Sequence, residues 1–542
     1  MLRALCIVAL LALALLLWRA GGTSLAGDYI DPVSHITGQD EALYAHSAIA
    51  MAREGDWLTP RFMGRYALYK PPMLIWSAAL SARAFGIAPW SLRLPIALMA
   101  ALSLGLLFLW AAELSGFSAG AMLVVLLLSN HLWLTLAGLC LTDGLLLAFC
   151  IGAFYALFSD PWLESRAGLG GFSACVAGAI LTKGIAGFLP LIVLGCYWLA
   201  ARPKERPTFL RITLAALLAF ALAAPWFLYQ YAVHPRWFWT EHIAVEILGY
   251  GGGAPPQTSQ ENQALFYFMR LAATDPLLLA ASCLALPAFF RALRRRTGAA
   301  VLLACWLGAV LLTTLAWQYR NASYLLPLIP ALAVLAAGWG PFSTPRYSRW
   351  MLLGLGAFFF VKISLPQAPW GLNFEGGTVQ PAAPALVSYC EQARGNPLIV
   401  VDLADDLYAA TLPLARLRYA AVVPAAAGAS PYAMPFETLG ITVTGEQFRD
   451  LAALTPAYRT RLREWSLDSE APIATLITVR TAAELAALAA AHANTDFLVP
   501  ATYRNALQAA PQEYVGASLN YFLLLSRVAV PRLTRPAWTC KM

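Results

Sequence analysis

Long apolar segments recur along the first two thirds of the chain and constrain its fold more than any other feature. They are Ala4–Trp18, Pro72–Phe85, Leu94–Leu114, Ala119–Asn130, Leu132–Leu141, Leu145–Phe158, Phe172–Thr182, Ile185–Ala200, Leu214–Tyr231, Leu277–Phe290, Ala299–Trp317, Leu325–Trp339 and Trp350–Ile363. A helix that crosses a bilayer needs about 20 mainly apolar residues. With 60% hydrophobic and only 12% charged residues, a soluble enzyme, a disordered regulator or a disulfide scaffold is excluded. We therefore expect a mainly α-helical polytopic membrane protein with about 13 transmembrane helices, the first retained rather than cleaved as a signal.

The basic residues predict which way the chain is oriented. Three loops concentrate them: Arg202, Lys204, Arg206 and Arg211; Arg291, Arg294, Arg295 and Arg296; Arg346 and Arg349. The positive-inside rule places these loops in the cytoplasm, so the net charge of +8 indicates topology and not a nucleic-acid partner. The segments around Asn130 and Lys183 are each read as two helices, although merging both also satisfies the rule and moves Asp143 to the cytoplasm. With both split, loops 20–71 and 234–270, the turn at Asp143 and everything after Ile363 lie outside.

The last third of the chain has a different composition. Residues 1–363 form the expected membrane domain, whereas residues 364–542 mix acidic residues with short apolar runs. Three of these runs predict buried strands and one predicts a helix: Pro397–Val401, Ala474–Val479 and Phe497–Val499, and Ala482–His492. We therefore expect a C-terminal soluble α/β domain outside the membrane. In an oxidising compartment its two cysteines, Cys390 and Cys540, can form one disulfide.

The first outer loop carries candidate functional residues at its two ends. Asp40 precedes a predicted helix and is either its N-cap or a carboxylate that faces a cavity at the membrane surface. Lys70 leads directly into Pro71 and Pro72 at the start of the next helix. The cations of this loop either contact lipid headgroups or form an anion site; they are Arg53, Arg61, Arg65 and Lys70.

Further charged residues interrupt the apolar segments. Asp143 and Lys183 each precede a glycine and are read as turn residues, as a structural ion pair or as functional groups. Glu241 and His242 offer two possible ligands for a divalent metal, but adjacent residues face apart on a helix. The outer face also receives Arg270, Arg320 and Tyr324. No Walker loop, Ser-His-Asp set or His-Glu-x-x-His motif is present in the sequence, which argues against a nucleotide-driven pump.

These motifs occur in an order that resembles a known superfamily. They are Gly38-x-Asp40-Glu41-x-x-Tyr44, Tyr69-Lys70-Pro71-Pro72, Ser91-Leu92-Arg93-Leu94-Pro95, Thr142-Asp143-Gly144, Thr182-Lys183-Gly184 and Tyr324–Pro330. Their order is similar to that of the C-type glycosyltransferases (GT-C). Within these, the Lys-Pro-Pro and the closing soluble domain most resemble the lipid A amino-arabinose transferases.

The resemblance implies an enzyme of the bacterial inner membrane whose active site and C-terminal domain face the periplasm. Such an enzyme moves 4-amino-4-deoxy-L-arabinose from undecaprenyl phosphate to a phosphate of lipid A, which gives resistance to polymyxin and other cationic peptides. The expected course is inversion at the anomeric carbon by direct displacement. We expect a monomer that contacts membrane lipids and needs no cofactor, except that a divalent metal remains an open alternative.

The same chemistry assigns roles to the candidate residues. Lys70 is expected to stabilise the charge on the leaving lipid phosphate, and Asp40 and Asp143 complete the catalytic candidates. In the phosphate-acceptor reading the two acids orient the acceptor or bind the sugar's ammonium. The candidates for binding the donor and its phosphate are Tyr44, Tyr69, Lys70, Lys183, Arg270, Arg320 and Tyr324.

Two other functions remain open from the sequence. The first keeps the chemistry but uses a protein hydroxyl as acceptor, as in the related protein O-mannosyltransferases. Asp40 is then the general base, because a hydroxyl must lose a proton on attack. The second is a non-enzymatic lipid flippase, which leaves the outer soluble domain without a role.

Overall fold

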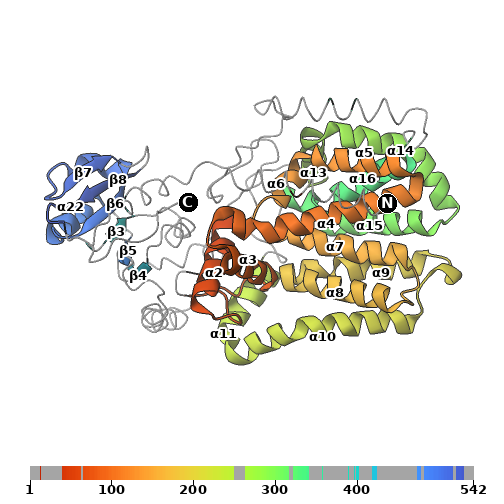
Figure 1. Ribbon diagram of the computed structural model, residues 1–542, viewed down its shortest axis with the longest axis horizontal. Coiled ribbons are helices and arrows are strands. Elements are labelled where there is room, and N and C mark those ends of the chain that lie inside the picture. Colours follow the sequence, from red (N-terminus) through yellow and green to blue (C-terminus); the bar gives the residue numbers. More distant parts are fainter. Residues whose placement is uncertain are drawn as a thin grey trace.

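In this computed structural model, a bundle of long helices is followed by a mixed β-sheet (Figure 1). The structure describes residues 40–62, 65–249, 263–316, 321–340, 398–401, 418–423, 473–477, 481–516 and 521–529, with a few isolated positions between them. The expected first helix, the segment Trp350–Ile363, and the cysteines Cys390 and Cys540 lie outside these described residues. Predictions about them stay predictions.

The bundle is built from helices that are apolar over most of their length. In chain order they are α2 (Asp40–Glu54), α3 (Met73–Phe85), α4 (Pro89–Ser115), α5 (Phe117–Leu128), α6 (His131–Ala137), α7 (Thr142–Ser159), α8 (Arg166–Lys183), η1 (Gly184–Phe188), α9 (Leu189–Ala200), η2 (Pro203–Glu205), α10 (Phe209–Val233), α11 (Pro235–Trp237), the π-helical η3 (Phe238–Gly249), α13 (Gln263–Thr274), α14 (Pro276–Arg294), α15 (Gly298–Ala316), η4 (Ala322–Leu325) and α16 (Leu328–Trp339). Within the described residues, seven helical segments are long and apolar enough to cross a membrane, or up to eight if a bent pair counts as one more. The chain is therefore a multi-pass membrane protein.

The number of crossings differs from the expected 13 at two places. Helix α3 has 13 residues, which is shorter than a bilayer requires. Helices α5 and α6 meet at an angle of 76° around Asn130, so they form either one broken crossing or a re-entrant loop. The Asn130 side chain accepts a hydrogen bond from the Trp133 N–H and caps α6. The chain thus breaks at Asn130, but separate crossings at Leu132–Leu141 and at Pro72–Phe85 are not confirmed.

The split at Lys183 agrees with the structure. The apolar segment Arg166–Ala200 has 35 residues, or about 52 Å as a straight helix, which is far more than one crossing of about 30 Å. At Gly184 the backbone takes a positive φ of 52°, which favours glycine. The chain then turns back. This is shown by the indole N–H of Trp162, which donates to the carbonyl of Lys204 at 3.0 Å. Trp162 lies just before α8 and Lys204 just after α9, so the ends of these helices that lie away from Gly184 meet.

The two cationic loops that the structure describes, at Arg202–Arg211 and Arg291–Arg296, gather at one end of the bundle. Arg202 donates to the carbonyl of Arg295 at 2.9 Å, which joins the loop after α9 to the end of α14. Asp143 at the start of α7 and Lys183 at the end of α8 lie at the opposite end, together with the start of α2. We refer to this opposite end as the site end.

A mixed six-stranded sheet follows the bundle in the chain. Its strands are β3 (Leu398–Val401), β4 (Arg418–Val423), β5 (Ile473–Ile477), β6 (Asp496–Pro500), β7 (Glu513–Gly516) and β8 (Tyr521–Leu525), in the order β4-β5-β3-β6-β8-β7. The first four are parallel, and β8 and β7 add antiparallel strands at one edge. Helix α22 (Ala482–Ala491) packs on it through Leu485 and Ala489. Figure 1 shows the sheet beyond the end of the bundle that holds α2, α3 and α11.

The strands expected at Pro397–Val401, Ala474–Val479 and Phe497–Val499 therefore exist, as does the helix at Ala482–His492. The α/β composition of this part is confirmed within the described residues. Its location outside the membrane is taken up below as a proposal.

Candidate active site at one end of the bundle

Helix α2 presents its first turn to the site end. It begins with Asp40 and Glu41, and carboxylates are favourable at a helix N-terminus because the helix dipole is positive there. Asp40 is exposed, whereas Glu41 is fully buried and Tyr44 nearly so. Because residues four apart share a helix face, Asp40 and Tyr44 line one surface while Glu41 turns into the bundle.

An ion pair joins the start of α7 to the end of α8, its neighbour in the bundle. The Nζ of Lys183, the last residue of α8, lies 2.9 Å from Oδ1 of Asp143, in the first turn of α7. Each residue sits at the helix end that suits its charge. Both side chains keep 16% of their surface accessible, and the ammonium lies 5.7 Å from the centre of the Tyr324 ring. The pair is thus reachable by a ligand.

A second ion pair lies where the loop after α2 meets η3. Lys70 pairs with Glu246, and both side chains remain partly accessible. The same loop is held by Glu241, whose Oε2 accepts a hydrogen bond from the Leu68 N–H at 2.6 Å. Tyr69 packs against Tyr44 with ring centroids 6.3 Å apart. Segment η3 therefore fixes the position of the residues that precede Pro71.

Electrostatic contacts show that these groups form one cluster. Although Asp40 is exposed at the start of α2, the protein atoms around its carboxyl desolvate it and raise its pKa, while Lys70 and Lys183 act in the opposite direction and Asp143 adds to the rise. Burial raises the pKa of Tyr44 well above its usual value, and Asp40, Glu246, Tyr69 and Asp143 raise it further. The site end thus brings together most of the expected residues: Asp40, Tyr44, Tyr69, Lys70, Asp143, Lys183 and Tyr324.

Two expected cations are not placed in this cluster. Arg270 lies on α13 with its guanidinium carbon 5.2 Å from the centre of the Phe266 ring. Helix α13 packs against η4, the segment that carries Tyr324, so Arg270 belongs to the same end of the bundle. Arg320 lies outside the described residues.

Glu241 and His242, the candidate metal ligands, each have a contact within the protein. Glu241 holds the Leu68 N–H, whereas the His242 ring stacks on Phe238 with centroids 5.1 Å apart. Burial and the charge of Lys70 lower the pKa of His242 to about 4, so its ring is neutral near pH 7. In the part of the chain that the structure describes, no three His, Cys, Asp or Glu side chains are grouped to hold a metal. The reading of Glu241 and His242 as metal ligands stays a prediction, and no step is assigned to a metal ion.

Two of the contacts at the site end involve residues to which sequence reasoning gave no role. Arg93 forms a buried pair with Glu41, and Glu246 pairs with Lys70. A signal existed for Arg93, since a charge inside an apolar helix needs a partner. For Glu246 the sequence offers only one carboxylate among several in its loop.

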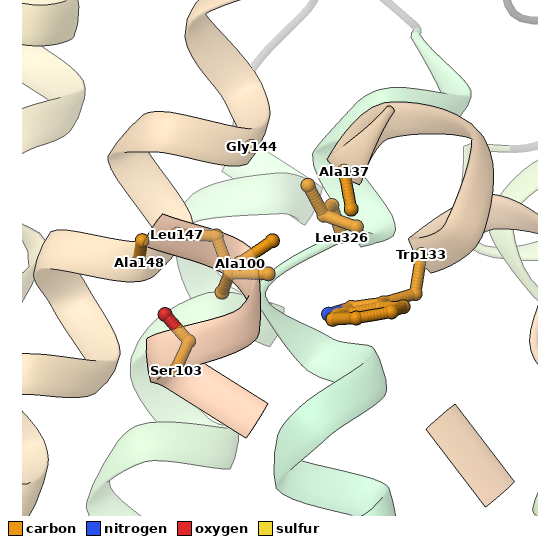
Figure 2. Close-up of a pocket in the computed structure, with 8 residues that line it drawn as sticks. All are labelled: Ala100, Ser103, Trp133, Ala137, Gly144, Leu147, Ala148 and Leu326. Atoms are coloured by element: carbon orange, nitrogen blue, oxygen red, sulfur yellow. The ribbon is translucent and has the colours of Figure 1, made fainter. Parts of the chain in front are cut away.

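A small pocket lies inside the bundle just below the site. It is formed between α4, α6, α7 and the end of η4 (Figure 2), and its lining is Ala100, Ser103, Trp133, Ala137, Gly144, Leu147, Ala148 and Leu326. This lining carries no charged group, so the pocket lacks the chemistry to bind a phosphate. Gly144 follows Asp143, and a Cβ at this glycine would lie 2.6 Å from the Leu136 carbonyl. The close packing of α7 on α6 at Gly144 therefore fixes the position of the preceding residue, Asp143.

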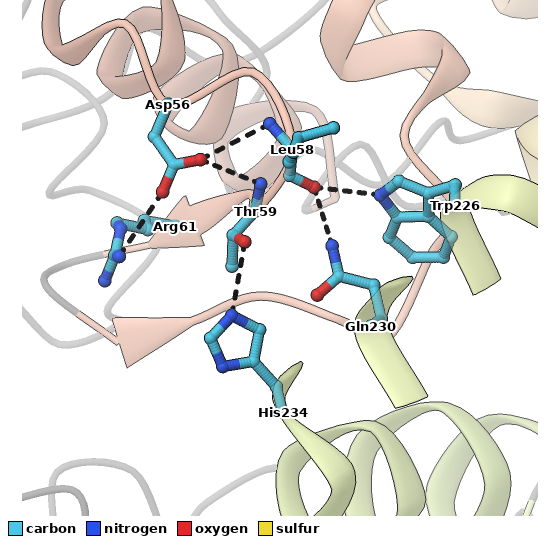
Figure 3. A network of polar contacts seen from close by, with 7 residues as sticks. All are labelled: Asp56, Leu58, Thr59, Arg61, Trp226, Gln230 and His234. Atoms are coloured by element: carbon cyan, nitrogen blue, oxygen red, sulfur yellow. Dashed lines mark hydrogen bonds and ion pairs between the residues drawn. The ribbon is translucent and has the colours of Figure 1, made fainter. Parts of the chain in front are cut away.

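The loop after α2 is anchored to α10 by a polar network (Figure 3). The Leu58 carbonyl accepts hydrogen bonds from Trp226 Nε1 at 2.9 Å and from Gln230 Nε2 at 2.6 Å. Asp56 in turn accepts from the N–H groups of Leu58 and Thr59, at 3.3 and 3.1 Å. The network therefore ties this loop to α10, a helix long enough to cross the membrane. The far end of the same loop carries Lys70.

The fold of the chain is similar to that of a solved ArnT structure, and part of the chain matches a mannosyltransferase family. Residues 69–229 match the family described as dolichyl-phosphate-mannose-protein mannosyltransferase. The whole chain is similar to the crystal structure of ArnT from Cupriavidus metallidurans bound to undecaprenyl phosphate. The TM-score is 0.65 at 18% identity, over 96% of this chain and 97% of that one. This likeness establishes the fold.

Sequence relatives narrow the resemblance. An uncharacterised protein of Aquifex aeolicus (strain VF5) is 29% identical over 55% of this chain and 58% of its own length. The undecaprenyl phosphate-alpha-4-amino-4-deoxy-L-arabinose arabinosyl transferase of Edwardsiella ictaluri (strain 93-146) is 26% identical over 62% of each chain. The alignments thus span about 60% of these relatives. The resemblance to the amino-arabinose transferases that the motifs indicated is confirmed.

Proposed function

We propose that the protein is an inverting glycosyltransferase that moves 4-amino-4-deoxy-L-arabinose from undecaprenyl phosphate to a phosphate group of lipid A. The observation that carries this proposal is the cluster at the site end. There, two accessible lysines and Asp40 converge in a bundle with the fold of ArnT. The names of the sequence relatives support the same donor sugar.

In this reaction an oxygen of the acceptor phosphate attacks the anomeric carbon. The bond from that carbon to the donor phosphate oxygen breaks, and its electron pair leaves with undecaprenyl phosphate. Lys70 stabilises the negative charge that builds on the leaving group, with Lys183 as a second cation. Because a phosphate acceptor is already anionic near neutral pH, Asp40 and Asp143 serve to orient the acceptor or to bind the sugar's ammonium.

We also propose an orientation and a domain division. The arginine-rich end faces the cytoplasm by the positive-inside rule, so the site end faces the periplasm of a bacterial inner membrane. Residues 1–363 then form the membrane domain, and residues 364–542 form a soluble domain on the side of the active site. The protein is expected to work as a monomer.

Reconstitution tests the activity directly. The purified protein is mixed with lipid A and undecaprenyl-phosphate amino-arabinose, and the sugar adduct is measured by mass spectrometry. We expect an adduct with wild type and a loss of about a hundredfold or more in Lys70→Ala, the scale seen when a charge-stabilising donor is removed. Asp40→Asn should also be impaired. Lys204→Ala and Glu164→Gln, at the opposite end, serve as controls. Full activity in both site variants would overturn the proposal.

A second acceptor is supported by one observation, the match of residues 69–229 to a protein mannosyltransferase family. With a protein hydroxyl as acceptor, Asp40 takes the proton, and the raised pKa of its carboxyl suits a general base. Labelled sugar found on protein and not on lipid A would support this alternative.

A further inference from the structure

The Lys70–Glu246 pair poses an electrostatic problem for any phosphate that binds Lys70. Both side chains are mostly buried, with 17% and 16% of their surface accessible. A phosphate that takes the ammonium leaves the carboxylate without its partner. Removing one member of such a pair is costly, because the remaining charge is only partly solvated. A ligand that carries an anion alone therefore has to overcome this cost.

Two described neighbours of Glu246, His242 and Lys183, do not supply it with a second positive charge. His242 precedes it on the same segment, but its low pKa of about 4 keeps the ring neutral near pH 7. Lys183 is already held by Asp143 at 2.9 Å. The carboxylates Asp40 and Asp143 lie in the same cluster, since both they and Glu246 act on Tyr44. Among the described groups that form this cluster, carboxylates thus outnumber lysines by three to two.

A ligand that carries both a negative and a positive charge avoids the cost of separating Glu246 from Lys70. If it carries a phosphate and an ammonium one sugar ring apart, each member of the protein pair exchanges its partner for an oppositely charged group of the ligand. The flexible stem of lysine allows Lys70 to move aside as the ligand enters. No charge is then left unpaired in the bound state.

We infer that the Lys70–Glu246 pair is the recognition element for a donor that carries a phosphate and a free ammonium, with Glu246 as the residue that selects the amino sugar. The inference rests on the proposed function and deepens it, because it assigns the amine to one carboxylate. Asp143 then remains with Lys183, and Asp40 is left to face the acceptor.

Binding measurements on the full-length protein in lipid nanodiscs test this assignment. The three probes are undecaprenyl phosphate, undecaprenyl-phosphate amino-arabinose and undecaprenyl-phosphate arabinose, which has a hydroxyl in place of the amine. Wild type should bind the amino donor about tenfold or more tightly than the arabinose donor, the scale of a hydrogen bond between charged groups.

Glu246→Gln should change the affinities in opposite directions. Undecaprenyl phosphate should bind several-fold more tightly, because Lys70 has lost its internal competitor, whereas the amino donor should bind about tenfold more weakly. Glu246→Asp, which keeps the charge, should retain the preference for the amine. Glu113→Gln, an exposed glutamate at the other end of α4, is the matched control, and thermal melting checks that each variant is folded.

The outcomes separate the two proposals. Equal weakening of all three ligands in Glu246→Gln would show a structural role and overturn the inference. Equal affinity of wild type for the amino and arabinose donors would overturn it as well. If wild type binds undecaprenyl phosphate and transfers the sugar in these cases, the proposed function still stands; if it does neither, the proposed function itself fails.

Discussion

The Glu41 carboxylate accepts hydrogen bonds from both Nε and Nη2 of Arg93, at 2.7 and 2.8 Å. Neither side chain is more than 1% exposed. The same carboxylate accepts a third bond, from the Cys140 N–H at 2.8 Å. One buried residue therefore holds together the start of α2, the start of α4 and the connection that leads into α7. Asp40 directly precedes Glu41, and Asp143 lies three residues after Cys140. The positions of both acids therefore depend on Glu41.

We predict that Glu41→Gln destabilises the protein strongly. The substitution removes the Glu41 charge from the buried Arg93 guanidinium, and breaking a buried pair in this way costs about 3–5 kcal/mol. Thermal or denaturant unfolding in detergent measures the change, with Glu113→Gln as control. The double variant Glu41→Leu/Arg93→Met should recover part of the loss, since it removes both charges. A Glu41→Gln protein as stable as wild type would contradict the prediction.

Asp143 and Lys183 should be coupled in a double-mutant cycle. Asp143→Asn and Lys183→Met each break the 2.9 Å pair, so their effects on stability should be non-additive by about 0.5–3 kcal/mol. Activity should behave differently. If Lys183 also stabilises the leaving phosphate, the double variant regains stability but not transfer. A double variant with wild-type transfer would show that the pair is structural only.

Acid should destabilise the protein through His242. Its pKa is about 4 in the folded protein and about 6.5 in an unfolded chain, so the unfolded state binds more protons between these values. Stability from this residue is therefore present above pH 6.5 and is lost as the pH falls towards 4. Between pH 7 and 5 the loss is about 2 kcal/mol. His242→Gln should show a correspondingly smaller loss in unfolding measurements, and an identical pH dependence would disprove the assignment.

The anchor between the first loop and α10 should be detectable by hydrogen exchange. Trp226→Phe/Gln230→Leu removes both donors to the Leu58 carbonyl, and each lost hydrogen bond costs about 0.5–1.5 kcal/mol. The amides of Leu58 and Thr59 should then exchange faster, while amides inside α7 should keep their rates. Phe209→Leu, an exposed substitution at the far end of α10, is the control. Unchanged exchange at both amides would mean that the loop is held by other contacts.

Most of the residues selected from the sequence lie together in the structure, whereas the number of crossings differs from the expected 13. Asp143 and Lys183 were predicted to be turn residues, functional groups or a pair, because a charge in an apolar region needs a partner. The turn after Lys183 could be anticipated from Gly184. Helix α3 misled the count because its apolar composition resembles a short crossing, and hydropathy alone does not report the bend at Asn130.

Contacts between residues far apart in the chain could not be predicted from the sequence, for a physical reason. Periodicity tells which face of a helix is apolar, but it does not tell which of several outer carboxylates meets Lys70. Glu246 lies 176 residues away from it. The strands were easier, because β3 and β6 are short apolar runs buried on both faces, whereas β4, β7 and β8 were not anticipated.

The order of the strands has a consequence for how the chain is made. Strand β3 ends at Val401 and lies between β5 and β6, which begin at Ile473 and Asp496. During synthesis the central strand therefore emerges well before either of its neighbours exists. Non-local pairing of this kind is slow and leaves apolar strands exposed meanwhile. The sheet can be completed only after β8 has emerged, so a chain truncated before Leu525 would present an unprotected edge for aggregation or proteolysis.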